Sequence, residues 1–227
     1  MQGSGSGVDA LPLKRAAELG IEVHNTPESI AESVAEHAVS LLFAMAHTIV
    51  EGDRNVRRGK WFDGLNYMRW HLTGRTLGLV GYGRIARHVE TMVSGFRMNV
   101  IHFDPFSKDS VPLVELLADS DCPLTEDTRH LIGMRELKLM KRNAVLVNTS
   151  RGAVVNEKAL IEALKNGIIG GAALDVTDPE PPEKDNPLFR MDNVIVTPHI
   201  AAFSADFEKN FWQCSVEKLK TLSGKFK

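Results

Sequence analysis

The residues from Thr76 to Asp104 read TLGLVGYGRIARHVETMVSGFRMNVIHFD. The apolar run from Leu77 to Val80 is typical of a short strand that is buried on both faces. A glycine turn, Gly81-x-Gly83-x-x-Ala86, follows directly, and a second apolar run from Val100 to Phe103 ends at Asp104. The order predicts a strand, a sharp turn, a helix, a second strand and an acid.

The glycine turn suits the diphosphate of a dinucleotide. Gly81 permits a tight turn, and Gly83 lets the backbone approach the diphosphate because it carries no Cβ. Ala86 is small enough for the helix to pack closely on the strand. The free N–H groups and the positive dipole end of the first helical turn, at Arg84 and Ile85, would then face the anion, and the Arg84 side chain adds a charge.

Asp104 follows the turn by about 20 residues, the spacing at which a carboxylate accepts hydrogen bonds from an adenosine ribose. The acid favours NAD over NADP, because it would repel a 2′-phosphate. A glycine turn alone also occurs between unrelated strands and helices, and Asp104 alone also fits a surface turn. The complete strand, turn, helix and acid sequence favours a dinucleotide-binding α/β fold with a doubly wound parallel sheet.

The composition is that of an ordinary soluble globular protein. The 227 residues are 43% hydrophobic and 25% charged, with a formal net charge of -2. The near-neutral charge argues against a nucleic-acid partner. The longest apolar segment, Ala38 to Val50, is too short to span a bilayer, so no membrane role is expected. Cys122 and Cys214 lie far apart without metal-ligand spacing, which suits a reducing cytoplasm and predicts no metal site.

The remaining chain alternates helices and strands. Leu13 to Leu19 predicts a short helix ended by Gly20, and Thr26 to Val50 predicts one long helix with Pro27 at its first position. His37 on that helix is expected to be a hydrogen-bonded, partly buried histidine. The other predicted elements are a loop from Gly52 to Gly74, a short helix from Leu113 to Ala118, strands at 144–148, 171–176 and 194–197, a helix from Glu157 to Asn166 and a C-terminal helix from Phe203 to Leu222.

Several motifs, in one order along nearly the whole chain, resemble the D-isomer-specific 2-hydroxyacid dehydrogenases. This family includes phosphoglycerate, glyoxylate/hydroxypyruvate and D-lactate dehydrogenases. The motifs are Gly5-Ser-Gly-Val-Asp9, Asn25-Thr-Pro27, Ser33-Val-Ala-Glu-His37, Gly74-Arg-Thr-Leu-Gly78, the glycine turn, Cys122-Pro-Leu-Thr125, Asn148-Thr-Ser-Arg-Gly152, Gly171-Ala-Ala-Leu-Asp-Val176, Glu180-Pro181 and Thr197-Pro-His-Ile200.

The resemblance implies catalytic roles for Arg151, Glu180 and His199. Arg151 would bind and polarise a 2-oxo acid, and its planar fork suits a carboxylate or a ketone oxygen. His199 would be the general acid/base that gives a proton to the carbonyl oxygen as hydride arrives from NADH. Glu180 would orient His199 and favour its protonated form. Taken singly, each of the three also fits an ordinary structural or surface position.

The resemblance also assigns binding positions. Asp175 matches a residue near the nicotinamide carboxamide, and the other cofactor-lining positions are Pro123, Thr128, Thr149 and Ser150. Ser6 and Gly7 match a loop whose backbone N–H groups hold the substrate carboxylate, although the Gly-Ser alternation of residues 1–7 also fits a featureless linker. The implied domains are a remnant of a substrate-binding domain at 1–35, an NAD-binding Rossmann domain at 36–200 and a returning C-terminal helix at 201–227.

The chain is shorter than the family pattern. Most of the substrate-domain segment before Gly5 is missing, as are a helix and strand between Pro105 and Pro112. A central strand before Cys122 also looks absent, which would leave two rows of unpaired backbone groups in the sheet. The shortfall has three explanations: residues left out of the sequence, a truncated gene, or a partner chain that supplies the missing pairing.

The sequence therefore predicts an NAD-dependent oxidoreductase that acts on a small 2-oxo or 2-hydroxy acid. The alternatives are a non-catalytic NAD-binding relative, such as a sensor or corepressor-like protein, and an inactive fragment. The family's dimer-forming region matches the predicted helix from Thr26 to Val50, so a cytoplasmic homodimer is expected.

Overall fold

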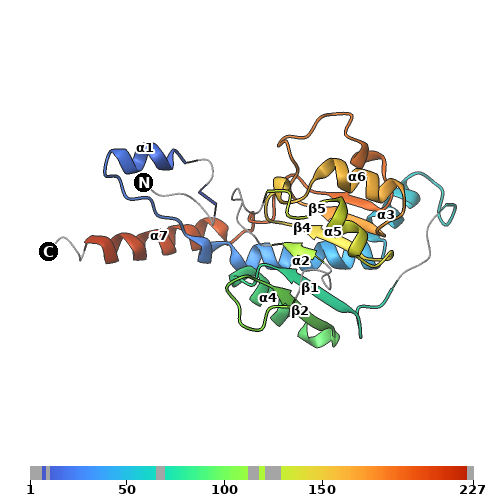
Figure 1. Ribbon diagram of the computed structural model, residues 1–227, viewed down its shortest axis with the longest axis horizontal. Helices are drawn as coiled ribbons and strands as arrows, with labels where there is room; N and C mark the ends of the chain where they lie inside the picture. The colour runs from blue at the N-terminus through green and yellow to red at the C-terminus, as the bar shows by residue number, and fades with distance from the viewer. Residues whose placement is uncertain (1–6, 9–10, 65–69, 112–117, 121–128, 224–227) are drawn as a thin grey trace.

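A computed structural model describes residues 7–8, 11–64, 70–111, 118–120 and 129–223 of the chain. Its centre is a six-stranded parallel sheet with the strand order β2-β1-β3-β4-β5-β6 (Figure 1). The strands are β1 (Thr76–Val80), β2 (Asn99–Phe103), β3 (Ala118–Ser120), β4 (Val145–Asn148), β5 (Gly171–Leu174) and β6 (Val194–Val196). The chain order reverses between β1 and β3, which is where open α/β sheets bind ligands.

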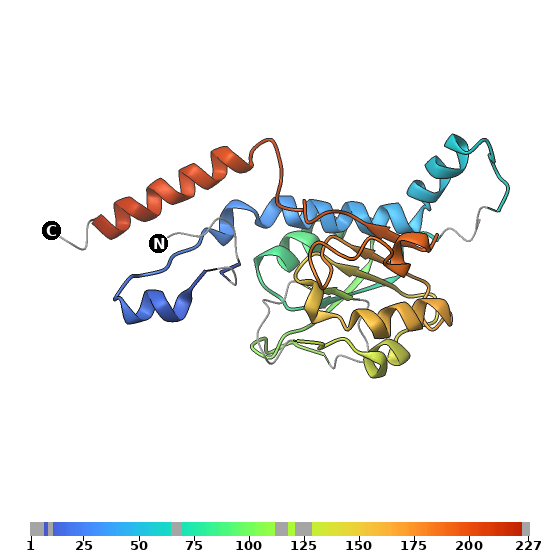
Figure 2. The ribbon, with the colours of Figure 1, turned by 90° about the horizontal axis from the view of Figure 1, so that it is seen from above.

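Helices cover both faces of the sheet. Figure 2 shows α2 (Ala31–Ala46) along one face and α6 (Glu157–Lys165) along the other. Alternate side chains of β4 explain this layering, because Val145 and Val147 pack toward α2 while Leu146 packs in the cluster that includes α6. The other helices are α4 (Arg84–Val93), which packs with α2, and α5 (Met134–Leu139), which packs with α6, together with short 3-10 turns at Ser94–Phe96, Gly152–Val154 and Pro187–Arg190.

The prediction of one continuous helix from Thr26 to Val50 is wrong. It divides into a 3-10 turn at Pro27–Ser29, helix α2 and helix α3 (Ile49–Arg57). The break lies at Thr48, whose left-handed backbone (φ 51°) bends α3 away from α2 by 61°. The apolar spacing runs on to Ile49, but the bend leaves that side chain 55% exposed. The predicted loop from Gly52 is accordingly too long, since α3 continues to Arg57.

Two other helix predictions are confirmed with their end signals. Helix α1 (Leu13–Glu18) is followed by Gly20 at φ 65°. Helix α6 begins where the Asn156 side chain accepts the Ala159 N–H group, and it is followed by Gly167 at φ 61°. Both glycines adopt the left-handed backbone that commonly ends a helix.

The expectation of a missing central strand is wrong. Ala118–Ser120 forms β3 and pairs in parallel with Gly78, Leu79 and Val80 of β1 on one side. On its other side Asp119 is in register with Val147 of β4. The strand is only three residues long, and Ala118 was predicted to end a helix that otherwise lies outside the described residues.

The N-terminal segment and the last helix lie together beyond one end of the sheet (Figure 1). Helix α7 (Phe207–Ser223) begins four residues later than predicted, because Phe203 and Ser204 are irregular and Ala205 and Asp206 form a turn. The Lys218 Nζ group donates a hydrogen bond of 2.6 Å to the carbonyl oxygen of Asn25. This contact joins helix α7 to the N-terminal segment outside the sheet layer.

Within the part of the chain that the structure describes, no single helix is long and apolar enough to cross a membrane. Helices α2 and α3 reach that length and composition only as a bent pair.

Candidate active site

The glycine turn lies at the carboxyl end of β1, beside the reversal in strand order. Gly81 has φ 84°, a backbone that favours glycine, and Gly83 is extended where α4 begins. No side chain caps α4, so the first N–H groups of the helix, at Arg84 and Ile85, have no side-chain acceptor from the N-cap. An uncapped helix N-terminus beside a switch point suits a diphosphate. The Ile85 side chain anchors the turn, because it is buried against the α2 and β1 core.

Asp104 ties the end of β2 to this turn. Its carboxylate accepts the backbone N–H groups of Tyr82 and Phe106, each at 2.8 Å. The Tyr82 ring stacks on His102 with 3.8 Å between ring centroids and carries the Arg87 guanidinium at 4.6 Å from its centroid. The carboxylate is thus held beside the glycine turn, the position in which an acid can meet a ribose.

The residues at the carboxyl end of β4 lie at the same edge of the sheet as the glycine turn. The Asn148 side-chain oxygen accepts the N–H and hydroxyl groups of Ser150, each at 3.0 Å, and its amide donates to the carbonyl oxygen of Arg151 at 2.9 Å. The Thr149 Oγ1 atom is buried and has no hydrogen-bond partner among the described residues. Buried hydroxyl groups are rarely left unpaired, so this atom fits contact with a bound cofactor.

The loop after β4 presses against the loop after β5. A Cβ atom built on Gly152 would lie 1.9 Å from the carbonyl oxygen of Thr177. The Thr177 N–H group donates in turn to Glu180 Oε1 at 3.1 Å. Because only glycine permits this approach, the contact brings the segment that carries Arg151 to the segment that carries Glu180. The Arg151 side chain is partly buried, and its Nη1 group donates to the carbonyl oxygen of Ser150 at 2.7 Å.

Glu180 and His199 form a direct pair. Glu180 Oε2 lies 2.9 Å from His199 Nδ1, and the side chains are 39% and 49% exposed. An ionised carboxylate only accepts hydrogen bonds, so Nδ1 carries the proton and Nε2 is left for a substrate. The pair borders a cavity of about 590 Å³ whose other lining residues include Asp175, Thr177, Phe189 and Thr197. A histidine oriented in this way can exchange a proton with a bound molecule.

Asp175 lies beneath the turn that carries His199. Its carboxylate accepts hydrogen bonds from Thr197 Oγ1 and from the N–H groups of Ile200 and Ala201. Burial raises the pKa of the Asp175 carboxyl, but hydrogen bonds from His37, Thr197, Ile200 and Ala201 outweigh that effect and lower the pKa below its usual value. Its predicted contact with a nicotinamide carboxamide stays a prediction.

The other predicted site residues have different placements. Gly7 lies in the N-terminal segment and is partly exposed. Ser6, Pro123 and Thr128 lie outside the described residues. His37 is confirmed as a hydrogen-bonded, partly buried histidine, with Nε2 at 3.1 Å from Thr197 Oγ1. Sequence reasoning missed the role of Thr197, although the residue stands in the same Thr-Pro-His-Ile motif as His199.

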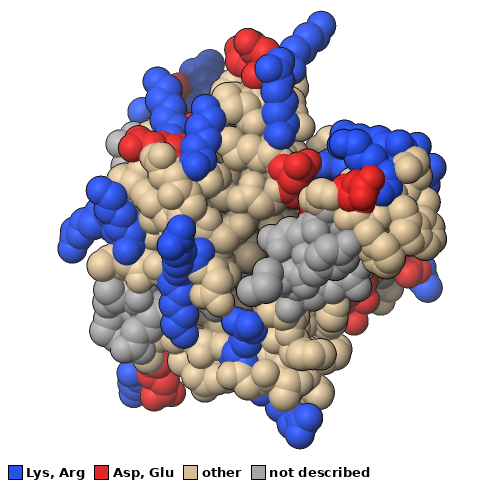
Figure 3. Space-filling view, turned by 90° about the vertical axis from the view of Figure 1, so that its right-hand side faces the viewer, with Lys and Arg blue, Asp and Glu red and all other residues tan. Residues whose placement is uncertain are grey.

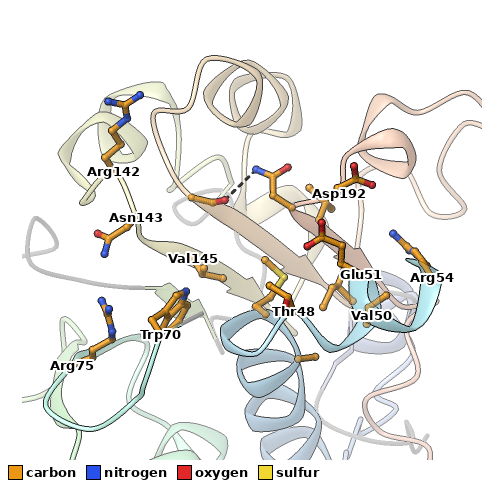
Figure 4. A pocket seen from close by; sticks show the side chains of 16 residues that line it. Thr48, Val50, Glu51, Arg54, Trp70, Arg75, Arg142, Asn143, Val145 and Asp192 are labelled. Atoms are coloured by element: carbon orange, nitrogen blue, oxygen red, sulfur yellow. Dashed lines mark hydrogen bonds between the residues drawn. The ribbon is translucent and has the colours of Figure 1, made fainter. Parts of the chain in front are cut away.

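A second cavity, of about 520 Å³, opens at the opposite edge of the sheet. Figure 3 faces this end of the molecule, where Lys and Arg side chains are spread over the surface. Figure 4 shows Glu51, Arg54 and Asp192 together at one end of the cavity and Trp70 with Arg75 at the other. The Arg75 guanidinium carbon lies 5.0 Å from the Trp70 ring centroid. This cavity lies at the amino ends of the strands, and it shares Arg54 and Val194 with the lining of the cavity beside His199.

The parallel sheet and the uncapped helix at its switch point are those of an α/β nucleotide-binding protein, and the Glu180–His199 pair lies at the same edge. Among the described residues no three His, Cys, Asp or Glu side chains are placed to hold a metal ion.

Sequence comparison gives the family. Residues 39–201 match the family model described as D-isomer specific 2-hydroxyacid dehydrogenase, NAD binding domain. The chain is 42% identical over 230 residues to a glyoxylate reductase of Korarchaeum cryptofilum, covering 94% of this chain and 69% of that protein. It is 41% identical over 232 residues to a D-3-phosphoglycerate dehydrogenase of Methanocaldococcus jannaschii, covering 96% of this chain and 44% of that protein.

Solved structures agree. A glyoxylate reductase from Paecilomyes thermophila superposes with a TM-score of 0.88 at 29% identity, covering 96% of this chain and 70% of that one. A D-lactate dehydrogenase from Aquifex aeolicus, complexed with NAD and lactic acid, gives a TM-score of 0.85 at 27% identity, covering 99% and 76%. The chain therefore belongs to the D-isomer-specific 2-hydroxyacid dehydrogenase family of oxidoreductases and contains its NAD-binding domain.

Gly152 offers a test of the contact between the two loops. We expect Gly152→Ala to lower the melting temperature by several degrees, because its Cβ cannot fit beside Thr177 without moving one loop. The control is Gly52→Ala, since a Cβ on Gly52 in helix α3 meets no atom within 4 Å and alanine favours a helix. Equal melting temperatures for the two variants would contradict the close contact.

Asp175 predicts a specific pH dependence of stability. The pKa of its carboxyl is lowered in the folded protein, so the carboxylate stabilises the fold fully above the unfolded pKa of about 3.9 and loses that effect as the pH falls through the folded value. The free energy of unfolding, measured by urea denaturation, should therefore be lower in Asp175→Asn than in the wild type at pH 7. The difference should shrink below about pH 4, and a difference that is constant down to pH 2 would contradict the assignment.

Proposed function

We propose that the chain binds NADH and reduces a small 2-oxo acid to a D-2-hydroxy acid. The observation that carries the proposal is the Glu180–His199 pair, held at the same sheet edge as the glycine turn and the Asn148–Arg151 loop. Arg151 would bind the substrate carboxylate and polarise its carbonyl group, and His199 would donate the proton from Nε2. Glu180 would keep the Nδ1 proton in place and stabilise the imidazolium.

The cofactor assignment follows from the glycine turn and its neighbours. NADH supplies the hydride when it is bound. Gly81, Gly83, Arg84 and Ile85 would hold the diphosphate through the start of α4. Asp104 would accept the ribose hydroxyl groups and disfavour the 2′-phosphate of NADP. Thr149, Ser150 and Asp175 would line the site toward the nicotinamide, with Pro123 and Thr128 assigned by resemblance alone.

The substrate side and the domain division are proposals as well. Ser6 and Gly7 would hold the substrate carboxylate through their N–H groups. Residues 36–200 would form the NAD-binding unit, while residues 1–35 and 201–227 would belong to a substrate-binding unit. The curated relatives named above are longer than this chain, so their activities are attributed to this chain only as a proposal.

A cytoplasmic location is supported by the free thiol of Cys214, which suits a reducing compartment.

The test is NADH oxidation with glyoxylate, hydroxypyruvate and pyruvate. We expect turnover in the wild type, slower turnover with NADPH, and a loss of kcat of about a thousandfold or more in His199→Ala, because general acid catalysis is removed. His47→Phe is the control, since His47 follows the far end of α2. NADH binding without turnover of any 2-oxo acid would favour a non-catalytic NAD-binding relative, and no shift in melting temperature with NADH would favour an inactive fragment.

We also propose that two copies associate through α3 and the segment after it. This projecting element carries large exposed apolar side chains at Ile49, Val56, Trp61 and Phe62, which are 53–65% exposed. Monomeric proteins rarely gather such side chains on one exposed element, and a second copy would cover them.

Analytical ultracentrifugation tests the homodimer. We expect twice the mass of one chain for the wild type and a shift toward monomer for Trp61→Ser combined with Phe62→Ser. Leu139→Ser is the matched control, because Leu139 is also exposed but lies on α5, away from this element. A wild type that sediments as a monomer would overturn the proposal.

A further inference from the structure

The turn that presents His199 is hydrogen-bonded to the residue that follows β5. The His199 N–H group donates to the carbonyl oxygen of Asp175 at 2.8 Å and also lies 3.0 Å from the carbonyl oxygen of Thr197 in its own loop. The next two N–H groups donate to the Asp175 carboxylate, from Ile200 to Oδ1 at 3.0 Å and from Ala201 to Oδ2 at 2.9 Å. Three consecutive backbone donors after β6 therefore depend on one residue at the end of β5.

His199 needs that support because of its backbone. Its φ of 53° is left-handed, a conformation that a residue with a side chain adopts only where its surroundings fix it. The imidazole is half exposed, and its Nδ1 atom is paired with the Glu180 carboxylate. The direction of the imidazole is therefore set mainly by the backbone turn and by Glu180.

Thr197 and His37 complete the support. The Thr197 hydroxyl group lies 2.5 Å from Asp175 Oδ1 and donates its only proton to that carboxylate oxygen. Its oxygen must then accept from His37 Nε2, which lies 3.1 Å away. His37 Nε2 is also 3.5 Å from Asp175 Oδ1, so the imidazole of a residue on α2 directs an N–H group at this pair.

We propose that His37 and Thr197 are positioning residues for His199. They hold the buried Asp175 carboxylate in the one orientation in which it accepts both Ile200 and Ala201. Their removal lets the carboxylate rotate, so the left-handed turn loosens and His199 no longer presents Nε2 to the substrate. This inference rests on the proposed function of His199 as proton donor and extends it to helix α2.

The geometry explains why the loss of the His37 or Thr197 side chain should lower kcat. The Asp175 side chain has no exposed surface, so the loss of a donor leaves a buried carboxylate oxygen short of a hydrogen-bond partner. The turn is the part of the network nearest to the surface, since Pro198, His199 and Ile200 are exposed. A displacement of about 1 Å at an acid/base group can reduce the rate about a hundredfold.

The experiment pairs removal with rescue. Thr197→Val and His37→Phe remove the hydroxyl and the N–H donor with little change in size. Thr197→Ser and His37→Gln restore a donor at each position. His47→Phe is the control, since it makes the same change on the histidine that directly follows α2.

We expect kcat to fall about tenfold or more in Thr197→Val and His37→Phe and to recover to within about threefold of the wild type in the rescue variants. The Kd for NADH should stay within about twofold, because the cofactor's main contacts lie at the glycine turn. The rate difference between NADH and NADH deuterated at the transferred position should increase, since the chemical step becomes limiting. His47→Phe should match the wild type.

The position of His199 is also measured without turnover. The imidazole signal in the NMR spectrum that disappears in His199→Gln identifies His199, and this signal should shift in Thr197→Val and His37→Phe but not in His47→Phe. If the wild type turns over no 2-oxo acid, the proposed function fails while this measurement still decides the positioning role. Unchanged kcat and an unchanged His199 signal in both removal variants would overturn the inference. The inference also fails if the affinity for NADH falls by the same factor as kcat and the melting temperature drops as well, because the variants would then be generally damaged.

Discussion

The Asp175 carboxylate is a buried charge, and a buried charge must be paired and fully hydrogen-bonded. It meets that requirement with donors from two parts of the chain: the residues after β6, which supply Thr197, Ile200 and Ala201, and helix α2, which supplies His37. Because the donors come from different elements, satisfying the charge fixes those elements relative to one another. His199 takes its position from that requirement.

A steric constraint on the neighbouring strands has a similar effect. The loops after β4 and β5 touch at Gly152 and Thr177, where no side chain fits. The Thr177 N–H group then orients Glu180, and Glu180 orients the His199 ring. Parallel strands end at the same edge, so these contacts gather residues that are far apart in sequence beside the glycine turn of β1. The site is thus assembled from strand ends, each held by the loop beside it.

Local signals were sufficient for much of this fold. Short apolar runs located β1, β2 and β4, and Gly167 marked the end of α6. The break at Thr48 was not predictable, because the apolar spacing continues through a residue that tertiary structure exposes. Strand β3 contains Asp119 and no apolar run, so its pairing with β1 depends on its neighbours and not on its own pattern.

Within the site, the sequence indicated residue types but not their contacts. The resemblance named Glu180 and His199, but the contact between their side chains was not available from spacing. The contact of Gly152 with Thr177 and that of His37 with Thr197 join residues distant in sequence, which no local periodicity records. Such contacts follow only from the parallel order of the strands.

The hydrogen bonds to Asp175 also make the position of His199 independent of the position of helix α7. Only residues 200–206 connect His199 to the start of α7, which lies outside the sheet layer with the N-terminal segment (Figure 1). The first two of these residues are bound to the Asp175 carboxylate through their N–H groups. A rotation of α7 about the following turns therefore leaves His199 in place as long as both hydrogen bonds hold. The Glu180–His199 pair is anchored to the residues that follow β5, so its geometry does not depend on where α7 lies.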